Sequence, residues 1–315
     1  MSESVGASRS VGVWAPARTL RLFVELSKPR LAGLLLAVTL VTYQIASQAV
    51  LRSPVEVPLP AISGLPFWYL FVALTTGVVW YASGMFALNQ YLERDLDRLM
   101  VRTAGRPLPS GRMQPQTALV YGVASVLVGT AILTVWVNVL CGVFALINLF
   151  VYLALYTPLK RITPLHTFIG AFAGAMPPLV GWTALTGSPG IEAWGLASIV
   201  FAWQFPHFYS VELKNLREYR RAQVKVLPVT DQGGRRVRAG IAVWTILTLA
   251  ASFTPLAVGL VRWWYAVPAT ALWIPFGYHA LETCRHYDVR HAHKLLRTSV
   301  LYLPLVFALI AISLV

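Results

Sequence analysis

Three side chains that could bind a divalent cation recur at helical spacing in one segment. Asn89, Glu93 and Asp97 are four residues apart, so on a helix they lie along one stripe. Mg²⁺ takes one or two carboxylates, keeps several waters and accepts its other ligands from substrate phosphate oxygens. The stripe therefore predicts a magnesium site. Asp95 faces another side of the same helix, where we expect it to form a surface ion pair with a neighbouring arginine.

A bent, arginine-containing loop follows this stripe. Arg102, Arg106 and Arg112 lie in a stretch whose helix is broken by Gly105, Pro107, Pro109 and Gly111. Such a loop can fold its arginines back over the acids, and the guanidinium group presents a planar fork to phosphate oxygens. The excess of basic residues in cytoplasmic loops of membrane proteins could by itself explain the arginines, but it does not explain the acids. Together the acids and arginines predict a site for a metal ion and a diphosphate.

A second charged segment, residues 201–229, reads FAWQFPHFYSVELKNLREYRRAQVKVLPV. His207 lies near the end of an apolar helix, where an ionisable residue is a functional hypothesis by default. It could be a haem-type ligand, a proton acceptor or a hydrogen-bonded structural histidine. Glu218 and Tyr219 could supply a second set of oxygen atoms, and Lys225 a further phosphate contact.

Two further segments carry polar residues beside apolar ones. Lys160 and Arg161 precede a span with small residues at 170–175, which could allow close helix packing or leave room for a bulky ligand. His166, at the head of that span, is interpreted as structural. Near the C-terminus a cluster of histidines is interpreted as a solvated loop rather than a metal site: His286, His291 and His293.

The composition places these segments in a membrane protein. Of 315 residues, 57% are hydrophobic and only 12% are charged, whereas soluble domains carry about 25% charged residues. Apolar runs of about 20 residues, long enough to cross a bilayer, recur along the chain. We therefore expect an all-α, polytopic membrane protein rather than a soluble helical one. Cys141 and Cys284 are the only cysteines, and their spacing indicates no disulfide framework or zinc site.

The positions of the charges predict a topology. We expect nine spans, at about 31–51, 67–88, 117–135, 139–157, 166–186, 193–211, 239–260, 263–281 and 298–315. Of the 26 Lys and Arg residues, all but Arg52 and Arg262 then lie on one side. This side is expected to be cytoplasmic and to hold the N-terminus, with the C-terminus opposite. The same rule explains the net charge of +14, which in a soluble protein would suggest nucleic acid; none is expected here.

The first thirty residues are expected to form a cytoplasmic N-terminal segment, and residues 31–315 a single transmembrane domain. The N-terminal segment lacks the apolar core and small-residue cleavage site of a signal peptide. The Arg and Ser residues of this segment are compatible with a transit peptide. The shortness of the segment, however, favours a bacterial cell membrane over the mitochondrial inner membrane.

Three motifs of this chain resemble those of the UbiA superfamily of intramembrane prenyltransferases. They are NQYLERDLDRLMVRTAGRPLPSG, YTPLKRITP with GAFAGAMPPLVGW, and WQFPHF with REYRRAQVKVLPV. The last two are similar to those of the branch that farnesylates haem, and the resemblance covers about residues 20–310. The chain departs from the family where Glu93 replaces an Asp, Glu218 replaces the Asp of an Asp-Tyr pair, and His166 replaces an Asn.

The resemblance implies a nine-helix fold around a central cavity capped by two charged loops. It implies transfer of farnesyl from farnesyl diphosphate to a vinyl group of haem B, with water completing the hydroxyethylfarnesyl group of haem O. It also implies roles for individual residues. Asn89, Glu93 and Asp97 would hold Mg²⁺ and diphosphate, aided by Arg102, Arg106, Lys160 and Arg161, while His207, Glu218 and Tyr219 fall in the haem-specific motif.

The residues suggest a reaction that begins with ionisation of the diphosphate. Mg²⁺ and arginines would stabilise the departing diphosphate, and an apolar cavity would keep water from the allylic cation. Three alternatives stay open: a family member with an aromatic or quinone-precursor acceptor, a non-catalytic haem-binding membrane protein, and a transporter. The transporter is disfavoured because the charges gather in loops rather than within spans. A downstream haem-modifying enzyme is a possible partner protein, beside the lipid bilayer.

Overall fold

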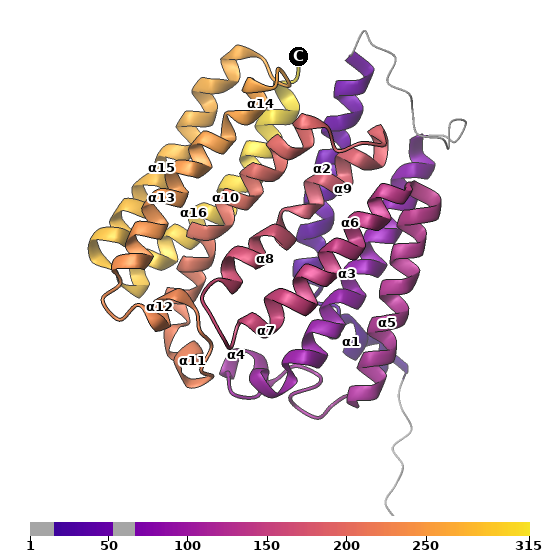
Figure 1. Ribbon diagram of the computed structural model, residues 1–315, viewed down its shortest axis with the longest axis vertical. Helices are drawn as coiled ribbons and strands as arrows, with labels where there is room; N and C mark the ends of the chain where they lie inside the picture. The colour runs from indigo at the N-terminus through magenta and orange to yellow at the C-terminus, as the bar shows by residue number, and fades with distance from the viewer. Residues whose placement is uncertain (1–15, 53–66) are drawn as a thin grey trace, which may run out of the picture.

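The computed structural model describes residues 16–52 and 67–315, and long helices running roughly side by side make up most of this part of the chain (Figure 1). The expected all-α class is confirmed. The first fifteen residues of the predicted N-terminal segment lie outside the described residues. Because the charged segments lie at helix ends and in the connections, the packing of the helices determines where these segments meet.

From α3 onward the helices follow one another with short connections. The helices of the main bundle are α2 (Pro29–Arg52), α3 (Phe67–Asp97), α5 (Pro115–Ile132), α6 (Val139–Leu149), α8 (His166–Gly174), α9 (Met176–Thr186), α10 (Gly190–Lys214), α13 (Arg235–Ser252), α15 (Ala266–His286) and α16 (Val289–Ile312). The helices outside it are α1 (Pro16–Leu26), α4 (Val101–Ala104), α7 (Thr157–Leu159), α11 (Leu216–Arg221), α12 (Leu227–Thr230) and α14 (Thr254–Ala257). Two π-helical turns, η1 (Leu133–Val137) and η2 (Phe150–Tyr156), and a 3₁₀ turn, η3 (Trp263–Tyr265), complete the set.

Each predicted apolar span overlaps helix in the described part of the chain. Among those residues, seven helical segments are long and apolar enough to cross a membrane, and the segments that contain α10 and α15 are not among them. Polar side chains explain the difference, because α10 carries Gln204, His207 and Glu212, and α15 carries His279 and Glu282. The structure therefore supports a multi-pass membrane protein, while the count of nine spans remains a prediction.

Glycines let α3 and α5 pack with their backbones close together. A Cβ atom added to Gly84 would collide with the backbone of Val126, and one added to Gly129 would collide with the backbone of Tyr81. Membrane helices use such small residues because close backbone approach supplies van der Waals contact that lipid cannot drive by exclusion from water. The close packing of α3 against α5 fixes the position of the C-terminal turns of α3, which carry Asn89, Glu93 and Asp97.

The charged loops meet at one end of the bundle. In Figure 1, α1, α4, α7, α11 and α12 gather at the lower end, and the C-terminus lies at the upper end. The loop after α3 and the loop after α10 share a small apolar cluster made of Leu96, Met100, Ala222, Val224 and Val226. Two segments more than 100 residues apart in sequence thus pack together, as the family resemblance implied for the two charged loops.

Candidate functional site

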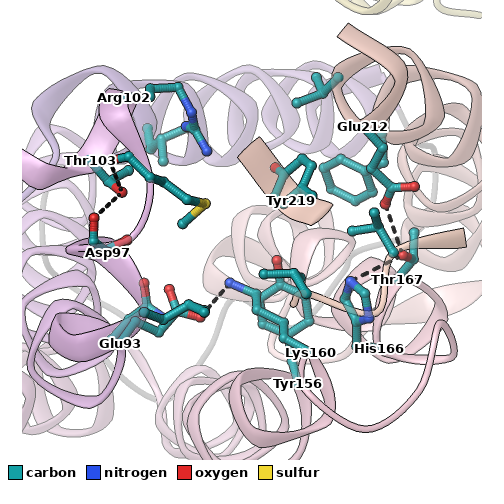
Figure 2. Close-up of a pocket in the computed structure, with 18 of the residues that line it drawn as sticks. Glu93, Asp97, Arg102, Thr103, Tyr156, Lys160, His166, Thr167, Glu212 and Tyr219 are labelled. Atoms are coloured by element: carbon teal, nitrogen blue, oxygen red, sulfur yellow. Dashed lines mark hydrogen bonds and ion pairs between the residues drawn. The ribbon is translucent and has the colours of Figure 1, made fainter. Parts of the chain in front are cut away.

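A cavity of about 310 Å³ lies where the two charged loops meet the helix ends. Its lining comes from α3, the α4 loop, η2, the start of α8, the end of α10 and α11. Figure 2 shows Glu93, Asp97 and Arg102 on one side of the cavity and His166, Thr167 and Glu212 on the other. The three side chains of the predicted stripe, Asn89, Glu93 and Asp97, therefore line one cavity together with several cations.

Each residue of the stripe is buried and bonded to a cation. Lys28 Nζ donates to Asn89 Oδ1 at 2.7 Å. Lys160 Nζ lies 2.5 Å from Glu93 Oε1, and Arg106 Nη1 lies 2.6 Å from Asp97 Oδ2. Burial of an acid is tolerated when a cation compensates its charge. Glu93 and Asp97 each have such a partner, and Asn89 accepts a hydrogen bond from a third cation.

The lysines at this site differ in their protonation. Burial lowers the pKa of Lys28 to about 7, helped by the nearby charge of Arg106. Burial also acts to lower the pKa of Lys160, but the adjacent carboxylate of Glu93 outweighs it and holds that pKa above its usual range. Lys160 is thus a fixed positive charge, whereas an anion in the cavity would favour the charged form of Lys28.

Lys28 reaches the cavity from the break between α1 and α2. Its backbone has a φ of 47°, in the left-handed region that non-glycine residues rarely adopt. Such strain persists where the surrounding structure imposes it, and it gathers at functional sites. From sequence this lysine counts only as N-terminal charge, so its place in the site was missed; no local pattern marks it.

The loop after α3 folds back over the stripe. Arg102 and Arg106 line the cavity, and Thr103 Oγ1 donates to the backbone oxygen of Asp97 at 2.9 Å. The Arg102 backbone N–H donates to Glu218 Oε2 at 3.4 Å and so ties this loop to α11. Arg112 instead pairs with Glu25 at 2.7 Å.

The π-helical turn η2 supplies the aromatic part of the wall. Tyr152 and Tyr156 stack with ring centroids 5.2 Å apart, and Lys160 Nζ lies 4.4 Å from the centre of the Tyr156 ring. A π-helical turn shifts the helix register, and such turns are frequent at functional sites. The electron-rich ring faces add to the favourable environment for cations.

A second cavity of about 240 Å³ adjoins the first and is mostly apolar. Leu31, Tyr152, Tyr156, His207 and Phe208 line both cavities. The remaining lining includes aliphatic and aromatic side chains of α2, α3 and α10, and the small residues Gly170, Ala173 and Gly174. The small residues therefore border a cavity and also allow close helix packing, because Gly174 of α8 packs closely against Gln204 of α10.

His207 stands between the two cavities with a defined hydrogen-bonding pattern. Ser299 Oγ donates to the backbone oxygen of Leu296 at 2.7 Å, so the hydroxyl oxygen of Ser299 is left to accept from His207 Nδ1, 2.9 Å away. The proton on Nδ1 leaves the lone pair on Nε2. The ring stacks on Trp203 with centroids 4.8 Å apart.

The structure gathers most of the predicted site residues but not all. Those that line the polar cavity are Asn89, Glu93, Asp97, Arg102, Arg106, Lys160, His207 and Tyr219. Arg161 is exposed and does not line it, and neither does Glu218, which contacts the loop backbone. Lining residues that were not predicted as site residues include Lys28, Tyr152, Tyr156, Thr167 and Glu212. Asp95 pairs with Arg98 at 3.6 Å outside the cavity, as predicted.

The histidines predicted to lie in a solvated loop instead lie in helices, where His286 at the end of α15 and His291 in the first turn of α16 form a separate cluster with Glu282. Glu282, His286 and His291 place potential ligand atoms within 4.8 Å of one another. Arg285 lies 3.3 Å from the same Glu282 carboxylate, and Asp288 Oδ2 lies 2.8 Å from His291 Nδ1. None of these side chains lines either cavity, so the cluster has no part in the site described above.

Comparison with known sequences gives consistent matches. A profile described as the UbiA prenyltransferase family matches residues 59–310. The "Protoheme IX farnesyltransferase" of Solibacter usitatus (strain Ellin6076) is 37% identical over 305 residues, covering 93% of this chain and 99% of that protein. The protein of the same name from Roseiflexus castenholzii is 37% identical over 93% of this chain, which spans 52% of that longer relative.

Solved structures share the fold at low sequence identity. One studied for "the biosynthesis of Digeranylgeranylglyceryl phosphate synthase in membranes" aligns with a TM-score of 0.74 and 15% identity, over 93% of this chain and 98% of that one. A UbiA homolog from Archaeoglobus fulgidus, bound to GPP and Mg²⁺, aligns with a TM-score of 0.60 and 16% identity, over 92% and 99%.

Proposed function

Because this chain belongs to the UbiA prenyltransferase family, we propose that it is a protoheme IX farnesyltransferase. It transfers the farnesyl group of farnesyl diphosphate to a vinyl group of haem B, releases diphosphate and forms haem O for haem–copper oxidases. The structural observation that carries this proposal is the pair of joined cavities. One cavity is lined by Asn89, Glu93 and Asp97 with their cationic partners, and the other is mostly apolar.

The donor set of the polar cavity fits Mg²⁺. Asn89, Glu93 and Asp97 offer an amide and two carboxylate oxygens along one stripe, which is the hard-oxygen chemistry that this ion prefers. Support also comes from the Archaeoglobus fulgidus homolog of the same fold, whose structure contains Mg²⁺ with a prenyl diphosphate. When bound, Mg²⁺ would neutralise charge on the diphosphate leaving group.

The cations of the cavity are suited to hold the diphosphate. Lys28, Lys160, Arg102 and Arg106 line the space beside Glu93 and Asp97, so positive charge is in excess at this end. Arginine forks and the lysine ammonium groups bind phosphate oxygens and stabilise the charge that builds as the C–O bond breaks. Tyr156 keeps Lys160 in place through its ring face.

The apolar cavity is suited to the prenyl chain. It opens from the polar cavity past Leu31, Tyr152 and Phe208, so a diphosphate held by the cations can extend its chain into it. Its apolar lining excludes water from the allylic cation, which would otherwise be quenched. The aromatic faces of Tyr152 and Phe86 also stabilise positive charge.

His207 is the candidate axial ligand of the haem iron. It lines both cavities, and its Nε2 carries the free lone pair because Ser299 accepts from the Nδ1 proton. Tyr219, from the same haem-specific motif, lines the polar cavity close by on α11. A haem bound through His207 would stand at the junction where the farnesyl cation forms.

The membrane topology is part of the proposal. We expect nine spans in a bacterial cell membrane, with α10 and α15 crossing it and the N-terminus and both charged loops on the cytoplasmic side. The location of α1 and the C-terminus at opposite ends of the bundle agrees with an odd number of spans (Figure 1). A downstream haem-modifying enzyme is the expected protein partner.

The test is a product assay. Purified protein in liposomes is incubated with haem B, farnesyl diphosphate and Mg²⁺, and the haems are analysed by mass. Haem O is the expected product. Haem bound but unchanged would favour a non-catalytic haem protein, and transfer to an aromatic or quinone precursor in place of haem would favour another acceptor.

A further inference from the structure

A cluster of metal-binding side chains lies where α15 meets α16, away from both cavities. Glu282 and His286 lie in the last turns of α15, and His291 lies in the first turn of α16. Each side chain offers one ligand atom, a carboxylate oxygen or an imidazole nitrogen, and the three atoms lie within 4.8 Å of one another. In the part of the chain that the structure describes, no other three His, Cys, Asp or Glu side chains come together in this way.

A two-residue turn brings the ligands of the two helices together. Only Tyr287 and Asp288 separate α15 from α16, and Tyr287 has a φ of 50°, in the left-handed region. The guanidinium group of Arg238 lies over the Tyr287 ring, 4.7 Å from its centre, and helps to hold this conformation. The chain therefore reverses directly after His286, and the ring of His291 returns beside the ring of His286 with centroids 4.3 Å apart.

Asp288 fixes the ring of His291. Its Oδ2 atom accepts a hydrogen bond from His291 Nδ1 at 2.8 Å, and its Oδ1 atom accepts one from the His291 backbone N–H at 2.8 Å. The proton on Nδ1 leaves the lone pair on Nε2. Histidines that bind metals are held in this manner, with the second ring nitrogen donating to a carboxylate. The His291 side chain is only 17% exposed, so its neighbours also restrain it.

Glu282 and His286 have a spacing that suits a metal ion better than a hydrogen bond. His286 Nε2 lies 3.5 Å from Glu282 Oε2, which is long for a hydrogen bond. Two ligands of a tetrahedral zinc ion, each about 2.0–2.1 Å from the metal, lie about 3.3 Å apart. Arg285 contacts the other oxygen, Oε1, at 3.3 Å, but this arginine is 63% exposed, and such surface pairs are weak. The ring of His286 is 53% exposed and is free to turn toward an ion.

We propose that Glu282, His286 and His291 bind Zn²⁺, with water as the fourth ligand. Two imidazoles and one carboxylate form a set that zinc accepts, whereas Mg²⁺ prefers oxygen ligands alone. The start of α16 lies at the end of the bundle opposite the C-terminus, where the charged loops gather (Figure 1). The ion links the end of α15 to the start of α16 and so stabilises this helix pair. The site is independent of the proposed function, because none of its ligands lines either cavity.

The experiment titrates ZnCl₂ into the purified full chain, without a histidine tag and stripped of metals, in excess Mg²⁺. Calorimetry should give one Zn²⁺ per chain, and Zn²⁺ should raise the melting temperature. His286→Gln changes an exposed side chain, so this variant should fold normally and bind Zn²⁺ at least about tenfold more weakly, as should Glu282→Gln. Asp288→Asn keeps a good N-cap for α16 but changes the partner of His291 Nδ1. It should weaken binding by roughly 10- to 100-fold while the stoichiometry stays at one.

The matched control is His293→Gln, which removes a histidine of α16 that is not in the cluster. It should bind Zn²⁺ with the parent affinity. A parent that binds no Zn²⁺, or parent affinity in both His286→Gln and Glu282→Gln, would overturn the site. Loss of binding in Asp97→Asn alone would place the ion in the polar cavity and would also overturn it. The titration uses neither haem nor farnesyl diphosphate, so its failure is distinguishable from failure of the proposed function.

Discussion

Arg106 Nη1 lies 2.6 Å from Oδ2 of Asp97, whose side chain is only 2% exposed. The loop after α3 thus returns an arginine to the acid that ends the helix. Arg106 compensates the buried charge of Asp97, and the pair places a candidate phosphate-binding cation beside a candidate metal-binding carboxylate. Substitutions at this pair and at its neighbours can separate these roles.

Asp97→Asn should abolish turnover while the protein stays folded. The substitution keeps the shape of the side chain but removes the charge that would bind Mg²⁺ and hold Arg106. We expect the rate of haem O formation to fall by at least about 100-fold. The matched control is Asp95→Asn, two positions along the same helix, where the side chain is 63% exposed and pairs with Arg98. A parent rate in Asp97→Asn would show that the acid has no metal role.

Glu93→Gln should abolish turnover and also lower stability. It leaves the buried ammonium of Lys160 without its carboxylate, and loss of one partner of a buried pair costs about 3–5 kcal/mol. A lower melting temperature in detergent should report this effect. Adding Lys160→Met to Glu93→Gln removes the stranded charge, so stability should recover while activity does not. An unchanged melting temperature in the single variant would contradict the pairing.

Substitutions of Lys160 and of its neighbour Arg161 should have very different effects on activity. Lys160 contacts Glu93 and Tyr156 within the cavity, whereas Arg161 is exposed outside it. Lys160→Ala should raise the KM for farnesyl diphosphate and reduce kcat by about 10- to 100-fold. Arg161→Ala should have a much smaller effect. Equal losses in the two variants would mean that Arg161 also helps to hold the diphosphate, as the family resemblance implied.

Ser299 should control haem binding through His207. Ser299→Ala removes the acceptor that keeps the proton on His207 Nδ1, and loss of such an outer partner weakens metal ligation by roughly 10- to 100-fold. Titration of haem B, followed by its absorption spectrum, measures this. His207→Ala should abolish the same spectral change. A parent spectrum in His207→Ala would assign the iron to another ligand.

The oxygen stripe could be predicted from sequence because its geometry is local. Asn89, Glu93 and Asp97 share a helix face whatever the rest of the chain does, and α3 extends to Asp97. The partners of the stripe could not be predicted. Lys28 lies 61 residues from Asn89, and Lys160 lies 67 residues from Glu93, so these contacts depend on how α2, α3 and η2 pack.

The limits of prediction are clearest at Glu212 and Arg161. Helical spacing gave no reason to connect Glu212 with Thr167, because the bond joins α10 to α8 across the cavity. Arg161 follows Lys160 in sequence, but the chain turns after α7 and leads it away from the cavity. The predicted number of membrane spans also depends on residues that face other helices rather than lipid. Polar residues make α10 and α15 less apolar than helices that only face lipid.

The most direct test of the proposed function is the mass of the haem product. Purified protein in liposomes is given haem B, farnesyl diphosphate and Mg²⁺, with Asp97→Asn as the inactive reference. We expect haem O from the parent, with one diphosphate released for each haem converted, and none from the variant. Haem B recovered unchanged from the parent, with farnesyl diphosphate intact, would contradict the assignment.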